Sequence, residues 1–295
     1  MPIFSIFLLV YIFTILENMA IILLVMRNSK LWKPMYIFIG NLSFLEIGYI
    51  NVTVPKMLSS ILIGSQEISY GGCVSQLFIF AFLCAAECYL LASMAFDRYV
   101  AICNPLRYPD IMQDKCVWCL LISSWLAGLF TPIFPIHFLN QTDFCGSNKV
   151  DHYFCDVSPL LRLACGDTHI EELVDFIIAA FVLITSLSVI ITSYIFIIWT
   201  VLKIPTSGYQ KAFSTCTSHL VVVCVFYGSL SFTYMRTTPA SGDSSNRIVS
   251  VLYSVITPLV NPVIYTLRNY DIRLTLKVCL ENWSKPKSQK TQAKS

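Results

Sequence analysis

The stretch Met94–Cys103, MAFDRYVAIC, ends the third long apolar segment of the chain and contains two adjacent, opposite charges. Asp97 and Arg98 stand at the inner end of that segment, where a charged side chain is costly unless it pairs or reaches water. We therefore expect the two charges to pair in one state of the molecule and to separate for a partner in another. The motif predicts a conformational switch at the end of a membrane-spanning helix.

The composition around this motif is typical of a membrane protein with several spans. Of the 295 residues, 56% are hydrophobic and only 13% are charged, whereas soluble domains have about 25% charged residues. The mean hydropathy is +0.68. The small net charge of +3 comes with no basic patch on a folded soluble segment, which argues against a nucleic-acid-binding surface.

Seven apolar stretches are long enough to cross a bilayer, which takes about 20 residues. They predict an all-α fold, a seven-transmembrane helix bundle. The spans lie at 3–26, 36–63, 73–102, 116–136, 173–202, 212–235 and 245–267. A short amphipathic helix is expected on the inner leaflet at 269–281, because apolar residues recur on one of its faces. Residues 1–283 then form one membrane domain, and residues 284–295 a disordered cytoplasmic tail.

The lysines and arginines set the orientation of these spans. Fifteen of them fall on the side that holds the C-terminal tail and the loops after the first, third and fifth spans, and five fall on the other side. Basic residues gather on the cytoplasmic side of membrane proteins. We therefore expect a multi-pass protein of the plasma membrane with an extracellular N-terminus and a cytoplasmic C-terminus.

The outer face carries four cysteines and the longest loop, residues 137–170. Cysteines facing an oxidising compartment predict two disulfides, and the residues alone allow three pairings. We expect the loop to fold back as a stapled lid over the helices. Its sequon at Asn140 lies on the correct face for glycosylation. The cysteines are Cys73, Cys145, Cys155 and Cys165.

Several polar side chains fall within the predicted spans and should face the bundle interior, because hydrocarbon excludes them. Two of them, Glu46 and Glu87, are carboxylic acids. If they face each other, they need a counter-ion or a shared proton. A bound sodium ion and a protonated glutamate with ordinary interhelical hydrogen bonds are both open interpretations. The remaining polar residues are Asn18, Asn41, His219 and Asn261.

Prolines predict bends in the seventh span. In the sequence NPVIY, Asn261 and Pro262 weaken a helical turn and Tyr265 follows one turn below. Such a turn can move a tyrosine between two packings. Tyr194, in the fifth span, is a second tyrosine near the inner face, and both could join Arg98 once its pair opens. The alternative is a simple kink, with the tyrosines as interfacial anchors.

Five strings of this chain, in order and at the right spacing, resemble olfactory receptors, a branch of the rhodopsin-like G-protein-coupled receptors. They cover most of the chain, from about residue 16 to 277. The strings are PMYIFIGNLSFLEIGY at Pro34–Tyr49, MAFDRYVAICNPLRY at Met94–Tyr108, SYIFIIWTVLKIP at Ser193–Pro205, KAFSTCTSHL at Lys211–Leu220 and TPLVNPVIYTLRN at Thr257–Asn269.

The resemblance implies a non-enzymatic receptor that binds an odorant and activates a stimulatory or olfactory-type heterotrimeric G protein. It implies the disulfides Cys73–Cys155 and Cys145–Cys165, and it places Glu46 and Glu87 at interior acidic positions associated with a cation. No other cofactor is expected. The residues expected to form the activation switch are Asp97, Arg98, Tyr99, Tyr194, His219, Asn261, Pro262 and Tyr265.

The odorant cavity is expected between the third, fifth, sixth and seventh spans, under the stapled loop. Most of the residues expected to line it are apolar, and a few carry a hydroxyl or a thiol, which suits a small hydrophobic ligand. The alternative for each of them is helix–helix packing. The expected lining residues are Phe80, Ala81, Cys84, Ile178, Val182, Tyr227, Leu230, Tyr234, Val251 and Ser254.

Other functions fit the sequence less well. A rhodopsin-like receptor for a non-odorant metabolite shares the same fold and switch. An ion-coupled transporter or channel would be expected to show repeated halves with paired broken helices, and none are visible. A membrane enzyme lacks the HExxH and GxSxG motifs.

Overall fold

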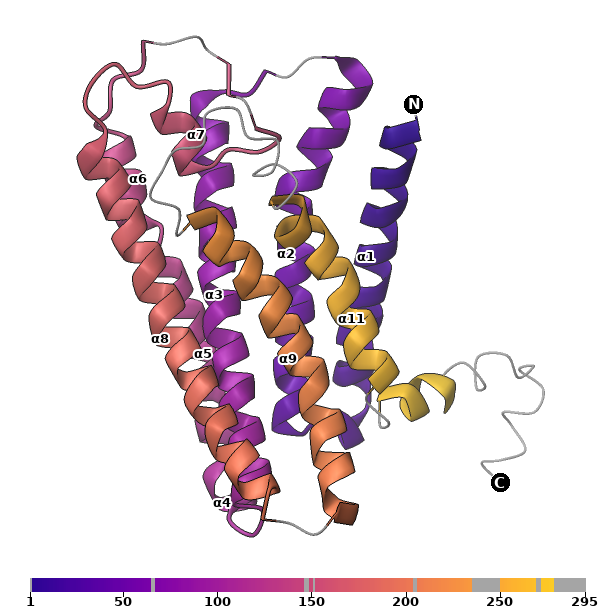
Figure 1. The fold of residues 1–295 in the computed structure, drawn as a ribbon. Helices are drawn as coiled ribbons and strands as arrows, with labels where there is room; N and C mark the ends of the chain where they lie inside the picture. Colours follow the sequence, from indigo (N-terminus) through magenta and orange to yellow (C-terminus); the bar gives the residue numbers. More distant parts are fainter. Residues whose placement is uncertain are drawn as a thin grey trace, which may run out of the picture.

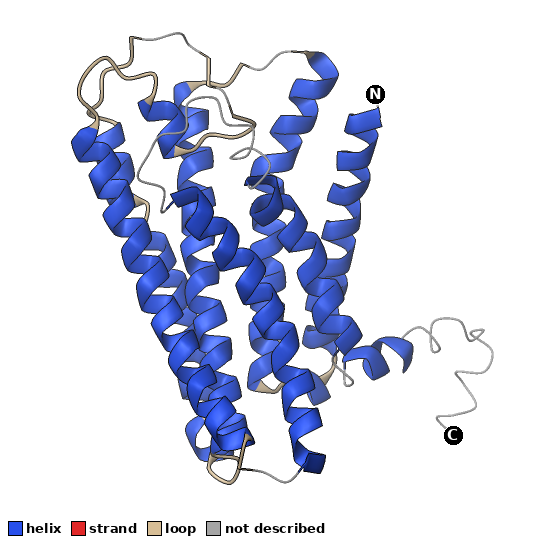
Figure 2. Ribbon diagram, viewed as in Figure 1, coloured by secondary structure: helices blue, strands red, loops and turns tan. Residues whose placement is uncertain are grey.

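The computed structural model of the chain describes residues 2–64, 67–145, 149–150, 152–203, 206–234, 250–268 and 272–278. Within these ranges the chain is helical apart from loops and one isolated bridge between Phe144 and Ala164 (Figure 2). For residues 206–215, 218, 252–253 and 265–268, only the backbone is described.

The first three membrane helices are long and continuous. They are α1 (Pro2–Arg27), α2 (Pro34–Ile63) and α3 (Tyr70–Cys103). A one-turn 3₁₀ helix, Ser29–Leu31, joins the first two. Gly64 ends α2 in the left-handed conformation, with φ of 73°, which a glycine adopts without steric cost. The Ser69 hydroxyl caps α3 by accepting a hydrogen bond from the Gly72 N–H, at 3.1 Å.

The predicted fourth span is two helices. After the short α4 (Tyr108–Ile111), α5 (Asp114–Phe130) ends at Thr131, and α6 (Ile133–Leu139) completes the crossing. The break falls at Pro132, which has no N–H to continue the helical ladder. Together the two pieces form one candidate membrane span, Asp114–Leu139, which covers the predicted 116–136.

The second half of the bundle contains the fifth, sixth and seventh crossings. They are α8 (His169–Val201), α9 (Thr206–Tyr234), and a π-helical turn, η2 (Leu252–Ile256), that runs into α11 (Thr257–Arg268). The N-terminal end of the seventh predicted span, 245–249, lies outside the described residues.

The helices form the predicted seven-helix bundle, in which the start of α1 and the end of α11 lie at opposite ends (Figure 1). Helix α3 is central, since it packs against α2, α5, α8 and α9. Among the described residues, five helical stretches are long and apolar enough to cross a membrane when Asp114–Leu139 is counted as one. The shorter apolar stretches His219–Tyr234 and Ser254–Ile264 belong to the sixth and seventh crossings. Large apolar side chains such as Leu9, Phe181 and Ile184 remain exposed on the outside of the bundle, as expected of a surface that contacts lipid.

Residues 272–278 form a short helix after the bundle, inside the predicted amphipathic segment. Ile272 is buried and Leu276 half-buried, whereas Arg273 and Lys277 are exposed. The flanking parts of that prediction, 269–271 and 279–281, and the predicted tail 284–295 lie outside the described residues.

Two disulfides fix the loop that covers one end of the bundle, the end predicted to face outward and called the outer end below. They join Cys73 to Cys155 and Cys145 to Cys165, with Cα–Cα distances of 5.4 and 5.3 Å. This is the pairing that the resemblance implied. Between them the loop forms a short helix, α7 (Val157–Leu161), whose first N–H is capped by the carboxylate of Asp156 at 2.9 Å.

Candidate functional site

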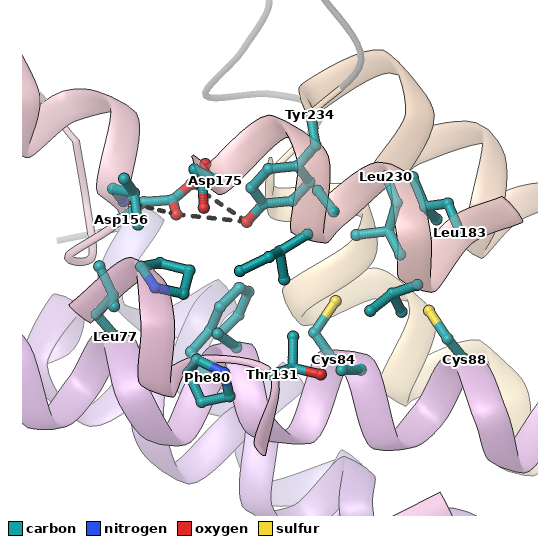
Figure 3. A pocket seen from close by; sticks show the side chains of 18 residues that line it. Leu77, Phe80, Cys84, Cys88, Thr131, Asp156, Asp175, Leu183, Leu230 and Tyr234 are labelled. Atoms are coloured by element: carbon teal, nitrogen blue, oxygen red, sulfur yellow. Dashed lines mark hydrogen bonds between the residues drawn. The ribbon is translucent and has the colours of Figure 1, made fainter. Parts of the chain in front are cut away.

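A cavity lies beneath the outer loop, bounded by α3, the break between α5 and α6, the start of α7, and helices α8 and α9 (Figure 3). Its volume is about 80 Å³, and its walls are mostly apolar. Cavities of this kind, apolar with a few convergent polar groups, are the usual form of a small-molecule site. The described lining residues include none from the seventh helix.

Seven of the ten residues expected in the cavity line it. They come from α3, α8 and α9, which are three of the four helices that the sequence placed around the ligand. The seven are Phe80, Ala81, Cys84, Ile178, Val182, Leu230 and Tyr234.

The other three predicted lining residues lie elsewhere. The Tyr227 hydroxyl donates a hydrogen bond to the backbone carbonyl of Cys88 at 2.9 Å, just below the cavity. Ser254 is fully buried, and its hydroxyl is 2.6 Å from that of Tyr153 in the outer loop. Val251 packs in a separate apolar cluster with α1 and α2 residues. Among the described residues, the seventh helix therefore contributes no side chain to this cavity, and it packs against α1, α2 and α9.

Sequence reasoning missed the part of the cavity formed by the fourth crossing and the outer loop. Thr131, Pro132 and Pro135 line the cavity at the helix break. The two prolines were the available signal, since they predict a bend inside an apolar span. Asp156 and Asp175 also line it, and the isolated acid inside the apolar span 173–202 was the signal for Asp175.

The two aspartates form a polar end to the cavity together with Tyr234 (Figure 3). The Tyr234 hydroxyl lies 3.4 and 3.3 Å from the two carboxylate oxygens of Asp156, to which it donates. Burial raises the pKa of Asp156, while the positive charge of His152 and the hydrogen bonds from the Val157 N–H and Tyr234 act in the opposite direction. A further positive charge at this end of the cavity would stabilise the charged form of Asp156, as His152 does.

Below the cavity, two bonds tie α9 to α3. One is the Tyr227–Cys88 bond, and the other joins His219 Nε2 to the Leu91 carbonyl at 3.1 Å. The second nitrogen of His219, Nδ1, is 2.9 Å from the hydroxyl of Tyr194 on α8. A carbonyl can only accept, so Nε2 carries the proton and Nδ1 accepts from Tyr194. His219 thus links three helices.

A second polar network connects the first, second and seventh helices. The side chain of Asn261 donates to a carboxylate oxygen of Glu46 at 2.6 Å. Asn18 donates to the backbone carbonyls of Thr14 and Pro258, at 3.0 and 3.2 Å. All three side chains are at most 2% exposed, so they face the interior as predicted. Asn41, which accepts from Trp125 at 3.3 Å, is half-buried.

Glu87 lies near this network on α3. It is 1% exposed, and its Oε1 atom has no hydrogen-bond partner. Glu46 is close enough for the two charges to repel. An orphaned carboxylate oxygen beside a second carboxylate fits either a bound cation or a proton. Among the described residues, no group of three or more histidine, cysteine or acidic side chains could hold a metal ion.

At the inner end of α3, Asp97 has a different partner from the one expected. Its carboxylate accepts a hydrogen bond from the Tyr108 hydroxyl at 2.7 Å, and within the described ranges no ion pair joins it to Arg98. Adjacent residues project about 100° apart around a helix, which separates the two charges. The Arg98 Nε atom is buried without a partner. Tyr99 packs against Phe196 of α8, with ring centroids 5.7 Å apart.

Pro262 is buried in α11, and the side chain of Tyr265 lies outside the description. The expected contact of Tyr265 with Arg98 therefore stays a prediction. Tyr194 bonds to His219 instead of Arg98 in this conformation.

Asn140 lies at the outer end of α6. It is exposed, and its side-chain oxygen accepts a hydrogen bond from the Tyr70 hydroxyl at 2.9 Å. The residue is therefore accessible for the modification expected there.

The family model described as "Olfactory receptor" matches residues 7–282 of this chain. Olfactory receptor 6B9 of Mus musculus is 49% identical over 271 residues, covering 92% of this chain and 86% of the relative. Olfactory receptor 6Q1 of Homo sapiens is 50% identical over 273 residues, covering 92% and 86%. Olfactory receptor 6Y1 of Homo sapiens is 48% identical over 275 residues, covering 93% and 85%.

Among solved structures, the crystal structure of squid rhodopsin is similar, with a TM-score of 0.74. The match covers 94% of this chain and 84% of that chain, at 18% sequence identity. At this identity the similarity establishes the fold.

Proposed function

The chain belongs to the olfactory receptor family, and on this premise we propose that a small, mainly hydrophobic odorant binds in the cavity beneath the outer loop and drives activation of a heterotrimeric G protein. As a member of this family the chain is a multi-pass membrane receptor and not an enzyme.

One observation carries the proposal. Cys88 lines the cavity, and its backbone carbonyl is also the acceptor for Tyr227 of α9. The backbone carbonyl of Leu91, one turn further along α3, accepts a hydrogen bond from His219, which is also on α9. A ligand that presses on this wall therefore acts on the helix turn that holds α9 in place.

The mechanism follows from these contacts. The ligand can shift the bundle only by binding one arrangement better than the other. We infer that the active arrangement breaks the His219 bonds, so the inner half of α9 moves away from α3. The movement frees Arg98, whose guanidinium then contacts the Gα subunit. Asp97, Tyr99, Asn261, Pro262 and Tyr265 take part in the same change.

We further propose a stimulatory or olfactory-type Gα as the partner, an extracellular N-terminus and a cytoplasmic C-terminus. The distribution of basic residues supports this orientation. The disulfides at the end of the bundle that carries Asn140 agree with it, because disulfides persist in oxidising compartments. Glycosylation of Asn140 belongs to the same proposal.

The pair of buried glutamates supports a cation or proton site in the resting receptor. Glu46 and Glu87 would hold a sodium ion or share a proton, either of which removes the repulsion between two buried carboxylates. Measuring basal signalling at several sodium concentrations separates the two possibilities. If sodium is bound, basal signalling should depend on sodium in the unaltered receptor, and this dependence should disappear in Glu87→Gln. If a proton is shared, basal signalling of the unaltered receptor should not depend on sodium.

The proposed function is tested by measuring cyclic AMP in cells that carry the full chain and an olfactory-type Gα, during exposure to a broad panel of volatiles. The response is expected to vanish in Arg98→Ala while surface staining persists. Lys149→Ala, an exposed outer-loop change, serves as the control and should respond normally. Good surface staining without any response would contradict odorant-driven signalling and favour a receptor for a non-odorant metabolite.

A further inference from the structure

The cavity has one strongly acidic end, and we propose that this receptor is selective for small protonated amines. The ammonium group would lie between Asp156 and Asp175, with its hydrocarbon part against the apolar wall. The inference rests on the proposed function, because it names the ligand class for the same cavity.

The two carboxylates reach the cavity from separate parts of the chain. Asp156 comes from the outer loop, next to the Cys73–Cys155 disulfide, and Asp175 comes from the second turn of α8. Both line the cavity, and their side chains lie side by side with Tyr234 (Figure 3). They are near enough for their charges to repel. The outer loop and α8 thus bring two negatively charged side chains close together, and this costs free energy in the receptor without ligand.

Asp175 is the clearer indicator of a ligand. Asp156 has partners, since it accepts from the Val157 N–H and from Tyr234. Asp175 is half-buried, and it lines the cavity. No hydrogen bond or ion pair to Asp175 occurs within the described part of the chain. A carboxylate aimed into an apolar cavity without a partner is suited to a cation that arrives with the ligand.

The charges around the site favour an organic cation. The positive charge that lies near Asp156 is that of His152. The Nδ1 atom of His152 is 3.1 Å from the backbone carbonyl oxygen of Phe154. In the described ranges, neither aspartate forms an ion pair with a lysine or arginine. A metal ion fits poorly, because no cluster of three suitable ligands exists among the described residues. An ammonium group donates three hydrogen bonds, which the two carboxylates and the Tyr234 oxygen could accept.

The rest of the cavity limits the ligand's size. Leu77, Phe80, Val182 and Leu230 supply apolar parts of the cavity wall. The volume of about 80 Å³ corresponds to about five to eight water-sized groups at roughly 10–15 Å³ each. An alkylamine such as hexylamine matches this size. An amine of this kind is protonated at neutral pH, since a primary amine has a pKa of about 10.

The test compares three compounds of equal chain length in cells expressing the full receptor. Hexylamine, hexanol and hexanoic acid differ in charge at one end but have nearly the same volume. Hexylamine is expected to activate at concentrations about tenfold or more below those of the other two, because only its charged group pairs with the carboxylates. Equal or greater potency of hexanol or hexanoic acid would overturn the inference.

Two variants test whether the preference for an amine depends on the two aspartates. Asp175→Asn should raise the hexylamine concentration for half-maximal response about tenfold, because the charge is lost while the shape is kept. Asp156→Asn should act in the same direction, and asparagine can still cap α7. Glu172→Gln, an exposed change three residues before Asp175 on α8, is the control and should leave the response unchanged. An unaltered hexylamine response in both aspartate variants, with normal surface staining, would contradict the inference.

The result also separates this inference from the proposed function. If neutral volatiles activate the receptor in an Arg98-dependent way and amines do not, the amine assignment fails and the odorant receptor function stands. If no compound of any class gives an Arg98-dependent response at normal surface expression, both fail.

Discussion

The two ends of α3 are held in opposite ways. At the outer end, Cys73 is bonded covalently to the loop, and the buried Gln76 side chain donates to the Val52 carbonyl at 2.7 Å while accepting from the Cys155 N–H at 3.0 Å. At the inner end, and within the described residues, Asp97 has a single hydrogen bond, from Tyr108, and Arg98 Nε has none. The outer end is therefore fixed and the inner end is ready to change partners.

This difference shows how a small ligand can act at a distance. Closely packed interiors pass on displacement because they cannot absorb it locally. A ligand under the loop cannot push the outer end of α3 outward, since the disulfide and Gln76 hold it. The displacement must pass to α9, which is tied to α3 by the two bonds of Tyr227 and His219.

Removing the outer disulfide should have the largest effect. The double change Cys73→Ser and Cys155→Ser opens a link between residues 82 apart in sequence, and the pair Cys145–Cys165 spans only 20. The chain-entropy relation gives about 4.5 kcal/mol for the first and about 3.3 kcal/mol for the second. Surface staining and thermal inactivation of purified receptor should show greater loss for the first pair. Equal losses would mean that the outer end is held mainly by packing.

The middle of α3 is held by close packing against α5. A methyl group added at Gly128 would lie 2.8 Å from the backbone nitrogen of Ala86 and 2.8 Å from the Phe82 carbonyl oxygen. Gly128→Ala should therefore force the two helices apart, at a cost of about 1–3 kcal/mol. Gly228→Ala on α9 is the control, because a methyl group there meets nothing within 4 Å. Thermal inactivation should separate the two variants, and equal stability would rule out tight α3–α5 packing.

Breaking the link between α8 and α9 should raise basal signalling. Tyr194→Phe removes the hydroxyl that bonds His219 Nδ1, and an interhelical hydrogen bond in a membrane protein is worth about 0.6–1.7 kcal/mol. If the bond forms only in the resting state, the active fraction rises about 3- to 20-fold.

Tyr89→Phe is the matched control for Tyr194→Phe, since the Tyr89 hydroxyl is 3.3 Å from Thr185 on the same helix α8 but does not reach α9. Basal cyclic AMP should stay unchanged in this variant. A rise of the same size in both would mean that loosening α8 alone activates the receptor.

The sequence predicted the class of fold well and the site only in part. Spans of apolar residues determine a membrane bundle almost by length alone, and the buried positions of Asn18, Glu46 and Asn261 follow from the cost of exposing them to lipid. The break at Pro132 follows from a local signal, the proline itself, whereas the contacts of the seventh helix with α1, α2 and α9 depend on packing between distant segments. Asp156 enters the cavity only through the course of a 34-residue loop, 137–170, which no local pattern determines.

The same chemical change at the two ends of α3 gives the most direct test of the comparison, although its effect is the smallest. Tyr108→Phe removes the hydroxyl that holds Asp97 at the inner end, and Tyr70→Phe removes the hydroxyl that bonds Asn140 at the outer end. Each change deletes one hydrogen bond, worth about 0.6 kcal/mol on average in a membrane protein.

The expected results differ because only the inner bond opposes the movement of the switch. Tyr108→Phe should raise basal cyclic AMP about threefold, the factor that 0.6 kcal/mol represents. Tyr70→Phe should leave basal signalling and ligand response unchanged. If both variants signal alike at equal surface expression, Asp97 is held by something other than Tyr108, and the inner end of α3 is as fixed as the outer end.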